Sequence, residues 1–371
     1  MKRVTDCHRR RFLQTFAGAT LLPSLRVPLC GQTFLSALHW PTRFAYLGAH
    51  DGIHVYSIAG DETFIKLQMM TSAYPVAMAI SNWNLYVVNG ISEFAGLPRG
   101  TAESYGIDAW SGKLTFRNRV PLSLSAISPR GLAVSPDGSA IVVAVHGGGA
   151  YNVLPIREDG SLGRVTGILK ETGSGPHRLQ VSAHPSALVF DSVGRVLGVD
   201  QGSDRLNVFT LRNHEIAAIC RHKVISGSGP MSIVLHPKEK RFFVAQALNA
   251  SISSFKYDPS VGSIVDHEQT VAAPVGDGIA SLAIHPSGKA LYSSHGRGIY
   301  AWRIAGNVLV HSSSHVENVQ PGALYVTKNA KSLFALTDDS VLRMRIDAFT
   351  EMPSAPVKVA SLCKPLSVAI V

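Results

Sequence analysis

Apolar residues recur along the chain in short runs that share one pattern. Seven similar segments, called seeds here, are spaced 54, 56, 45, 49, 42 and 44 residues apart and begin at Pro75, Pro129, Pro185, Pro230, Ile279, Pro321 and Pro365. Each seed has a small residue two places after its first residue. After most seeds come a tight turn, a β-rich run such as residues 140–145, an alternating strand such as residues 251–257, and a last, more polar strand. The pattern predicts a series of four-stranded antiparallel units.

A single sheet of this kind cannot bury both of its faces, so the units are expected to stack around a common axis. A repeat of roughly 40–50 residues is typical of β-propellers. We therefore predict an all-β fold, a seven-bladed β-propeller with four-stranded antiparallel blades. Two separate domains or a β-sandwich are the alternatives, and seven seeds in phase argue against both.

The two ends of the repeat are expected to complete each other. Residues 42–58 supply two strands with no seed before them, whereas residues 365–371 form a seed with nothing after it. The C-terminal strand is therefore predicted to close blade one, which makes residues 39–371 a single propeller domain.

Composition excludes several other classes of protein. Hydrophobic residues make up 46% of the 371 residues and charged residues 16%, which argues against disorder, coiled coil and collagen. No run of eighteen apolar residues follows the N-terminus, so a polytopic membrane protein is not expected. The cysteines are too scattered for a disulfide scaffold or a zinc site: Cys7, Cys30, Cys220 and Cys363.

The net charge of +10 does not indicate a nucleic-acid partner. Residues 1–30 hold six Lys or Arg against one Asp, a charge of +5, and the other +5 is spread over 341 residues without a basic cluster. We expect a monomer with a small-molecule substrate, no nucleic acid, and no membrane contact beyond export.

The N-terminus has the pattern of an export signal. Residues 9–13 read Arg-Arg-Arg-Phe-Leu, and the moderately apolar stretch 14–25 follows. This order predicts a twin-arginine signal and linker over residues 1–38, and hence a periplasmic or secreted protein. A basic amphipathic helix belonging to the fold is the alternative.

A longer stretch resembles a known family. Residues 143–156 read Val-Ala-Val-His-Gly-Gly-Gly-Ala-Tyr-Asn-Val-Leu-Pro-Ile, and Glu-Asp-Gly-Ser-Leu-Gly follows at 158–163. Together with Tyr46-Leu-Gly, residues 112–116 (Gly-Lys-Leu-Thr-Phe) and residues 227–230 (Gly-Ser-Gly-Pro), this segment resembles the seven-bladed β-propeller lactonase family, which includes one type of 6-phosphogluconolactonase. The resemblance covers roughly residues 42–371 and implies a lactone hydrolase that works in the central channel.

The sequence departs from that family at polar positions. Met231 and Ser232 stand where the family usually has Arg-His, and Gly90 and Ala247 stand where it has Glu. Ser186 replaces the second His of a His-Pro-His-Ser pattern. These departures favour a rival interpretation, a non-catalytic propeller that binds a carbohydrate or protein partner.

Candidate site residues lie at two positions of each repeat. The residue after each seed's first residue should face the channel, and among these only Arg130 is charged. The ends of the second strands form a more polar ring of Asn89, His146, Asp200, Gln246, His295 and Asp338, with Arg297 close by. The alternative is that these groups only cap strands and bind channel water.

Hydrolysis of a lactone needs a base and a partner for the developing oxyanion. We predict His146 as the base, Asp200 as its possible orienter, and Arg130 or Arg297 as the charge stabiliser. The predicted substrate-binding residues are Asn89, His184, Gln246, His295 and Asp338. Activity is expected to rise through about pH 6–7, the range of an ordinary imidazole.

The favoured function is hydrolysis of a sugar-derived or other small lactone. Export argues against 6-phosphogluconolactone itself, because phosphorylated sugar acids are cytoplasmic, and no arginine cluster stands at the seed positions. No cofactor and no metal are expected, since no Cys/His metal spacing occurs, and a redox or metal propeller lacks ligands in the sequence.

Replacing both Arg9 and Arg10 by lysine should hold the precursor in the cytoplasm. The export receptor reads the guanidinium pair, and an ammonium group does not offer the same donor geometry. Cell fractionation and immunoblotting check this expectation. Normal periplasmic levels of the doubly substituted protein would show that the signal is of another kind.

Overall fold

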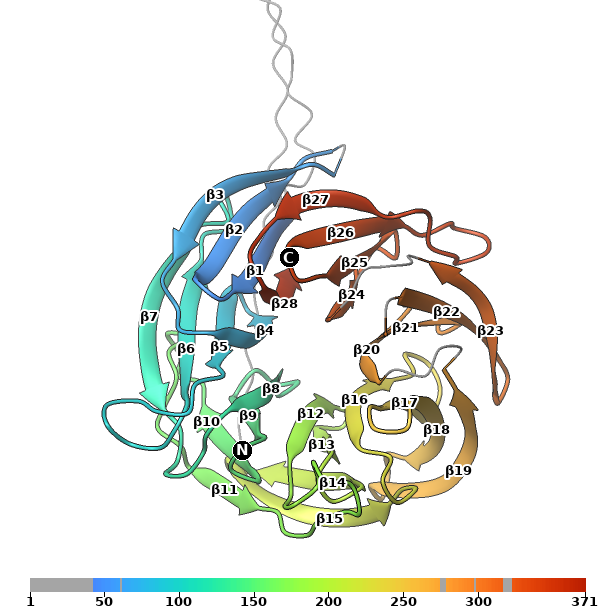
Figure 1. The fold of residues 1–371 in the computed structure, drawn as a ribbon. Helices are drawn as coiled ribbons and strands as arrows, with labels where there is room; N and C mark the ends of the chain where they lie inside the picture. The colour runs from blue at the N-terminus through green and yellow to red at the C-terminus, as the bar shows by residue number, and fades with distance from the viewer. Residues whose placement is uncertain (1–42, 61, 274–277, 297, 316–321) are drawn as a thin grey trace, which may run out of the picture. The chain divides into compact units, whose positions relative to one another are not determined.

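A computed structural model describes residues 43–371 of the chain, except residues 61, 274–277, 297 and 316–321. These residues form seven four-stranded antiparallel sheets arranged in a ring, the blades of a propeller (Figure 1). The predicted all-β seven-bladed propeller is therefore confirmed. The predicted export signal and the boundary after residue 38 lie outside the described residues and stay predictions.

Blade 1 joins the two ends of the described chain, and blades 2 to 4 follow in sequence order. From the inside outwards, blade 1 consists of β28 (Pro365–Ile370), β1 (Arg43–Ala49), β2 (Gly52–Ile58) and β3 (Phe64–Met70). Blade 2 consists of β4 (Pro75–Ser81), β5 (Asn84–Asn89), β6 (Thr101–Ile107) and β7 (Leu114–Pro121). Blade 3 consists of β8 (Pro129–Val134), β9 (Ala140–Val145), β10 (Ala150–Pro155) and β11 (Gly167–Lys170). Blade 4 consists of β12 (Pro185–Phe190), β13 (Arg195–Asp200), β14 (Arg205–Arg212) and β15 (Glu215–Lys223).

Blades 5 to 7 repeat the same plan. Blade 5 consists of β16 (Pro230–Leu235), β17 (Arg241–Gln246), β18 (Ser251–Asp258) and β19 (Ser263–Ala272). Blade 6 consists of β20 (Ile279–Ile284), β21 (Ala290–His295), β22 (Gly298–Ala305) and β23 (Val308–His315). Blade 7 consists of β24 (Leu324–Val326), β25 (Ser332–Leu336), β26 (Ser340–Arg345) and β27 (Val357–Ser361). In six blades the innermost strand begins at the first residue of a seed.

A β-bulge follows the first residue of the seed in these six blades. The pairing register of the innermost strand shifts there, so that one residue has no partner in the ladder: Val76, Arg130, Ser186, Met231, Ala280 and Leu366. A bulge turns the side chain of the extra residue away from its regular position. Blade 3 places a guanidinium group at this point.

The small residue at the third position of each seed lets neighbouring innermost strands approach closely. A Cβ added to Gly131 would lie 3.1 Å from the backbone oxygen of Ser186 in the next blade. Where this residue is serine, its hydroxyl bridges two blades. Ser367 Oγ donates to the backbone oxygen of Pro75 at 2.6 Å. Ser232 and Ser281 accept from the backbone nitrogens of Leu282 and Leu324, each at 3.2 Å.

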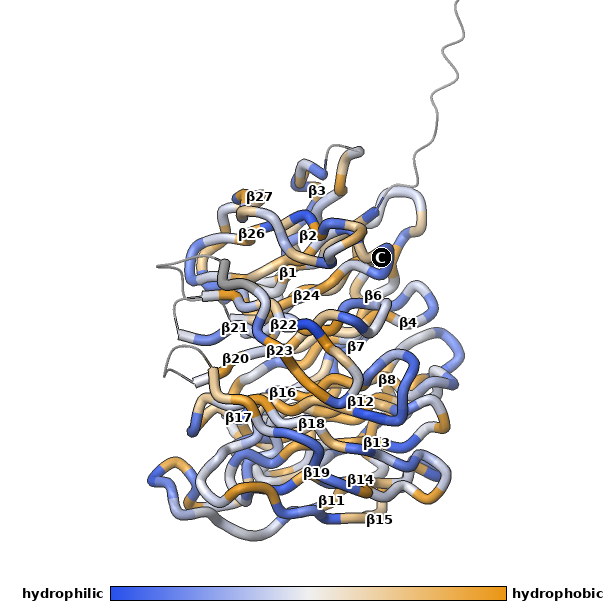
Figure 2. Tube along the Cα trace, turned by 90° about the vertical axis from the view of Figure 1, so that its right-hand side faces the viewer, coloured by the Kyte–Doolittle hydropathy of each residue, from blue (hydrophilic) through white to orange (hydrophobic). Residues whose placement is uncertain are grey.

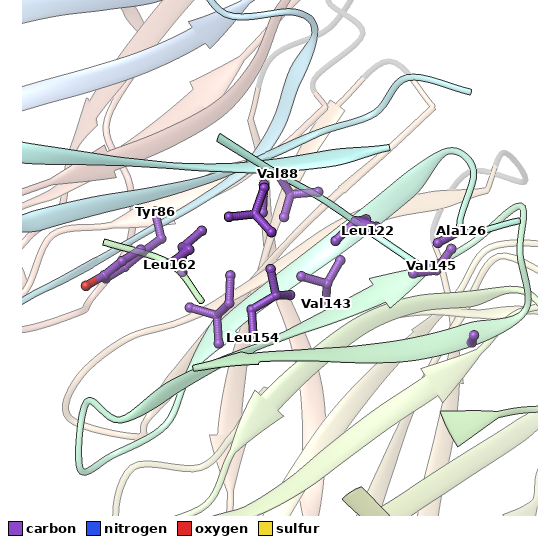
Figure 3. Close-up of a cluster of buried hydrophobic side chains, with 12 residues drawn as sticks. Tyr86, Val88, Leu122, Ala126, Val143, Val145, Leu154 and Leu162 are labelled. Atoms are coloured by element: carbon purple, nitrogen blue, oxygen red, sulfur yellow. The ribbon is translucent and has the colours of Figure 1, made fainter. Parts of the chain in front are cut away.

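The hydrophobic core is divided among the interfaces between adjacent blades. Seven clusters of buried apolar side chains occur in the described part of the chain, one at each interface. Figure 3 shows the cluster between blades 2 and 3, where Val88 and Val143 lie at its centre. Figure 2 shows that hydrophobic segments follow the strands, whereas many turns at the faces are hydrophilic.

The closure of the ring is the one predicted from the unmatched ends of the repeat. β28 pairs antiparallel with β1, and Phe44 and Val371 exchange two backbone hydrogen bonds of 3.1 and 3.0 Å. Both strands pack into the apolar cluster shared by blades 1 and 7. The last strand of the chain therefore forms the innermost strand of blade 1.

Deleting residues 362–371 should destabilise the whole propeller. The deletion removes β28, exposes one edge of β1, and removes Leu362 and Ile370 from the core between blades 1 and 7. We expect Tm to fall by at least about 10 °C, since a loss of several kcal/mol shifts Tm by a few degrees per kcal/mol. Differential scanning calorimetry measures the change, and an unchanged Tm would contradict the closure.

Candidate active site

The start of each innermost strand and the end of the second strand lie at the same face of the propeller. Pro129 pairs with Val145 in blade 3, and Pro185 pairs with Asp200 in blade 4. Arg130 and His146 therefore lie at one edge of blade 3, and His184 lies at the matching edge of blade 4. This face is where the predicted site residues gather.

His146 and His184 form a stacked pair across the junction of blades 3 and 4. Their ring centroids are 4.7 Å apart and the rings are nearly parallel, at 15°. His184 Nδ1 lies 2.9 Å from the backbone oxygen of His146, to which it donates. The ring of His184 lies over Gly202, where a Cβ would come within 2.7 Å of His184 Cδ2. The same Cβ would lie 1.9 Å from the backbone oxygen of Ser182, so the backbone before His184 leaves room only for glycine at position 202.

Gln201 makes the side-chain hydrogen bond to His146. Its Oε1 lies 3.1 Å from His146 Nε2. Because an amide oxygen only accepts, Nε2 carries the proton and Nδ1 is the basic nitrogen. The backbone nitrogen of Gln201 donates to the backbone oxygen of His184 at 3.1 Å. Gln201 was not among the residues selected from the sequence, although it directly follows Asp200.

Asp200 makes no hydrogen bond to His146 but holds the backbone next to the site. Its Oδ1 accepts three backbone hydrogen bonds, from His184 at 2.7 Å, Gly202 at 3.0 Å and Ser203 at 3.1 Å. Its side chain is fully buried. The carboxylate therefore fixes the backbone of His184 and the turn after β13, while Gln201 takes the place next to His146 that was predicted for Asp200.

The imidazole of His146 is neutral at physiological pH. Desolvation by burial, followed by the nearby positive charge of Arg130, lowers the pKa of His146 to about 4. The side chain of Arg130 is exposed overall. The protein around its guanidinium group still removes part of the surrounding water, and this desolvation lowers the pKa of the group. The sequence predicted an ordinary imidazole that titrates at pH 6–7, and the pKa corrects that expectation. The physical cause is burial between two blades, which the sequence does not display.

Two predicted binding residues, Asn89 and Gln246, are buried and form hydrogen bonds within their own blades. Asn89 is fully buried, where its amide nitrogen donates to Ser72 and its oxygen accepts from Thr101, both at 2.8 Å. Gln246 is also fully buried and bonds Ser251 at 2.7 Å and Ser253 at 2.9 Å. These side chains tie strands together at the positions predicted for contacts to substrate.

His295 and Asp338 line a second hollow of the same face, at blades 6, 7 and 1. A cavity of about 300 Å³ lies between them and is bounded by Ala280, Gly322 and Pro365. The small residues Ala280 and Gly322 stand at the seed positions that hold Val76 and Arg130 elsewhere, so the cavity arises from missing side chains. His295 is buried and stacks on Tyr300 with centroids 3.8 Å apart. Arg297 lies outside the described residues.

Tyr74 is a further residue of this face that the sequence did not single out. It directly precedes the seed residue Pro75, is 41% exposed, and has a positive φ of 58°. Its ring lies 6.0 Å from the ring of His50 in an edge arrangement. Its place directly before a seed is the signal that the sequence offers.

The described residues contain no cluster of three or more His, Cys, Asp or Glu side chains that is arranged to hold a metal ion. No helix within the described ranges is long and apolar enough to cross a membrane.

A family model for the lactonases with a 7-bladed β-propeller matches residues 42–340. This match covers most of the chain, and the observed fold agrees with it, so the protein belongs to the seven-bladed β-propeller lactonase family.

Individual relatives are distant. The 6-phosphogluconolactonase of Bacillus subtilis (strain 168) is 28% identical over 230 residues, which are 61% of this chain and 64% of that protein. The chain thus spans less than two thirds of the length of this relative. The 6-phosphogluconolactonase of Pectobacterium atrosepticum is 26% identical over 252 residues, 65% of this chain and 70% of that protein. The structure of a periplasmic gluconolactonase from Pseudomonas aeruginosa has a TM-score of 0.81 at 21% identity and covers 89% of this chain and 99% of that one. That structural likeness concerns the fold alone.

Replacing Arg130 by methionine should raise the pKa of His146 from about 4 toward the ordinary value of about 6.5. The positive charge of Arg130 disfavours a second charge on the imidazole, and methionine keeps much of the side-chain volume without the charge. An NMR titration of the histidine rings measures the shift. Arg345→Met, on the opposite face, is the control that should leave the pKa of His146 unchanged. An equal pKa in both variants would contradict the coupling.

Proposed function

We propose that this protein hydrolyses a sugar-derived or other small lactone at the His146–His184 edge of the channel face. The observation that carries the proposal is a neutral imidazole with a fixed tautomer, placed beside a guanidinium group on a bulge. Membership of the lactonase family supports the same reaction. Both groups that ester hydrolysis needs, a base and a positive charge for the oxyanion, are present in one blade.

The reaction follows from the roles of these two groups. His146 Nδ1 accepts a proton from water while the water oxygen attacks the lactone carbonyl carbon. The carbonyl oxygen becomes an oxyanion, which Arg130 stabilises. The ring C–O bond then breaks, and the leaving alkoxide takes the proton back from His146. The product is the open-chain hydroxy acid.

The substrate we infer is a lactone without a phosphate group. The relatives from Bacillus subtilis and Pectobacterium atrosepticum are each named 6-phosphogluconolactonase, and that name describes those two proteins. In this chain Arg130 is the only basic residue at the second position of a seed. A phosphate group is normally held by several cationic or amide donors. Export through the twin-arginine route, proposed from residues 1–38, agrees with an unphosphorylated substrate in the periplasm.

His146→Ala should lower kcat/KM for glucono-δ-lactone by about a hundred- to ten-thousand-fold, the usual cost of losing a general base. In the wild type, activity requires neutral His146, so it should be flat across pH 6–8 and fall as the pH drops through about 4. Acid release in a pH-stat, corrected for spontaneous hydrolysis, measures both quantities.

His177→Ala is the control for this substitution, because His177 lies in the surface loop before blade 4 and contacts backbone there. It should retain wild-type activity. Full activity of His146→Ala would move the base elsewhere. A wild type that binds a sugar or a protein but hydrolyses no lactone would favour the non-catalytic propeller.

A further inference from the structure

Tyr74 presents an aromatic ring to the channel face in a conformation that costs energy. Its φ of 58° lies in the left-handed region, which bulky residues rarely adopt. Such conformations persist where surrounding structure enforces them, and they often occur at functional sites. The ring is 41% exposed, so burial of apolar surface in the core does not explain it.

The surroundings of Tyr74 fix the ring in one place. Its backbone oxygen accepts from the backbone nitrogen of Gly90 at 2.9 Å. A Cβ on Gly90 would lie 3.1 Å from Tyr74 Cδ1 and 2.6 Å from Val76 Cγ1, so the absence of a side chain at position 90 makes room for the ring. His50 of blade 1 contacts the ring edge with centroids 6.0 Å apart. Blades 1 and 2 thus hold the ring from two sides.

Tyr74 and Arg130 stand at matching points of neighbouring blades: Tyr74 directly precedes the first seed residue of blade 2, and Arg130 directly follows that of blade 3. The inner strands β4 and β8 of these two blades are neighbours in the ring, and the positive charge of Arg130 in turn acts on His146. Tyr74, Arg130 and His146 therefore follow one another around the channel face, from blade 2 to blade 3. An aromatic face next to a guanidinium group suits a ligand with a carbon ring or chain and an anionic or carbonyl oxygen.

We propose that Tyr74 and Arg130 form a substrate-binding subsite in which the ring of Tyr74 packs against the carbon skeleton of an aldonolactone or aldonate while Arg130 holds its carbonyl or carboxylate oxygen. The subsite rests on the proposed function and names its substrate class. It places the reacting carbonyl group between Arg130 and His146. Tyr74 acts here through binding, so its loss changes affinity rather than the chemical step.

Binding of D-gluconate to the full-length protein tests the subsite independently of hydrolysis. Isothermal titration calorimetry should show Tyr74→Asn binding gluconate about three- to tenfold more weakly than the wild type, the usual worth of an aromatic contact. Asparagine is chosen because it tolerates positive φ. Tyr74→Phe keeps the ring and should bind within about twofold of the wild type. In turnover of glucono-δ-lactone, Tyr74→Asn should raise KM by a similar factor and leave kcat nearly unchanged.

Trp83→Asn is the matched control. Trp83 is also an exposed aromatic residue with positive φ, at 48% exposure and 56°, but it lies at the other end of β4. It should bind gluconate like the wild type, which separates a local effect of Tyr74 from a general effect on blade 2. Unchanged affinity in Tyr74→Asn, or a wild type that binds no gluconate, would overturn the subsite. Gluconate binding that depends on Tyr74 without any lactone turnover would keep the subsite and reject the proposed hydrolysis.

Discussion

The close approach of the innermost strands is the constraint on which the rest of this propeller depends. Each blade can bury its two faces only against its neighbours, and the neighbours converge most tightly near the axis. A residue larger than glycine at position 131 would press on the backbone of the next blade, and three serines turn the same closeness into hydrogen bonds between blades. The small third residue of the seed is therefore a packing requirement that appears in the sequence as a repeat.

The β-bulge beside that small residue gives the ring its chemistry. Because the bulged residue has no partner in the ladder, its side chain can vary without disturbing the sheet. Blades 2 and 5 fill the position with Val76 and Met231, blade 6 leaves it nearly empty with Ala280, and blade 3 uses it for Arg130. The same β-bulge thus carries an apolar side chain, a small side chain beside a cavity, or a positive charge in different blades of the same face.

Most of the fold could be predicted from the sequence, but less of the candidate site could be. Blade number, the first residue of six inner strands and the closure of β28 on β1 all follow from apolar periodicity and turn residues, which are local properties. The site depends on which way polar side chains turn at the strand ends. Asn89 and Gln246 occupy the same position in the repeat as residues that line the face, yet neighbouring serine and threonine hydroxyls hold them inside their blades. The stack brings together His146 and His184, which belong to different blades and are 38 residues apart in sequence. The lowered pKa of His146 comes first from burial and then from the charge of Arg130, and neither can be seen in the sequence.

The low pKa of His146 bears on what happens as a reaction proceeds. In the proposed reaction, opening a lactone produces a carboxylic acid, which releases a proton and acidifies the surroundings of the site. An imidazole with an ordinary pKa near 6.5 would become protonated early in that process and stop accepting protons from water. An imidazole with a pKa of about 4 keeps its lone pair until the surroundings are as acidic as the product itself. If the proposed hydrolysis takes place at His146, burial between two blades therefore protects that imidazole from protonation by the acid that the reaction releases.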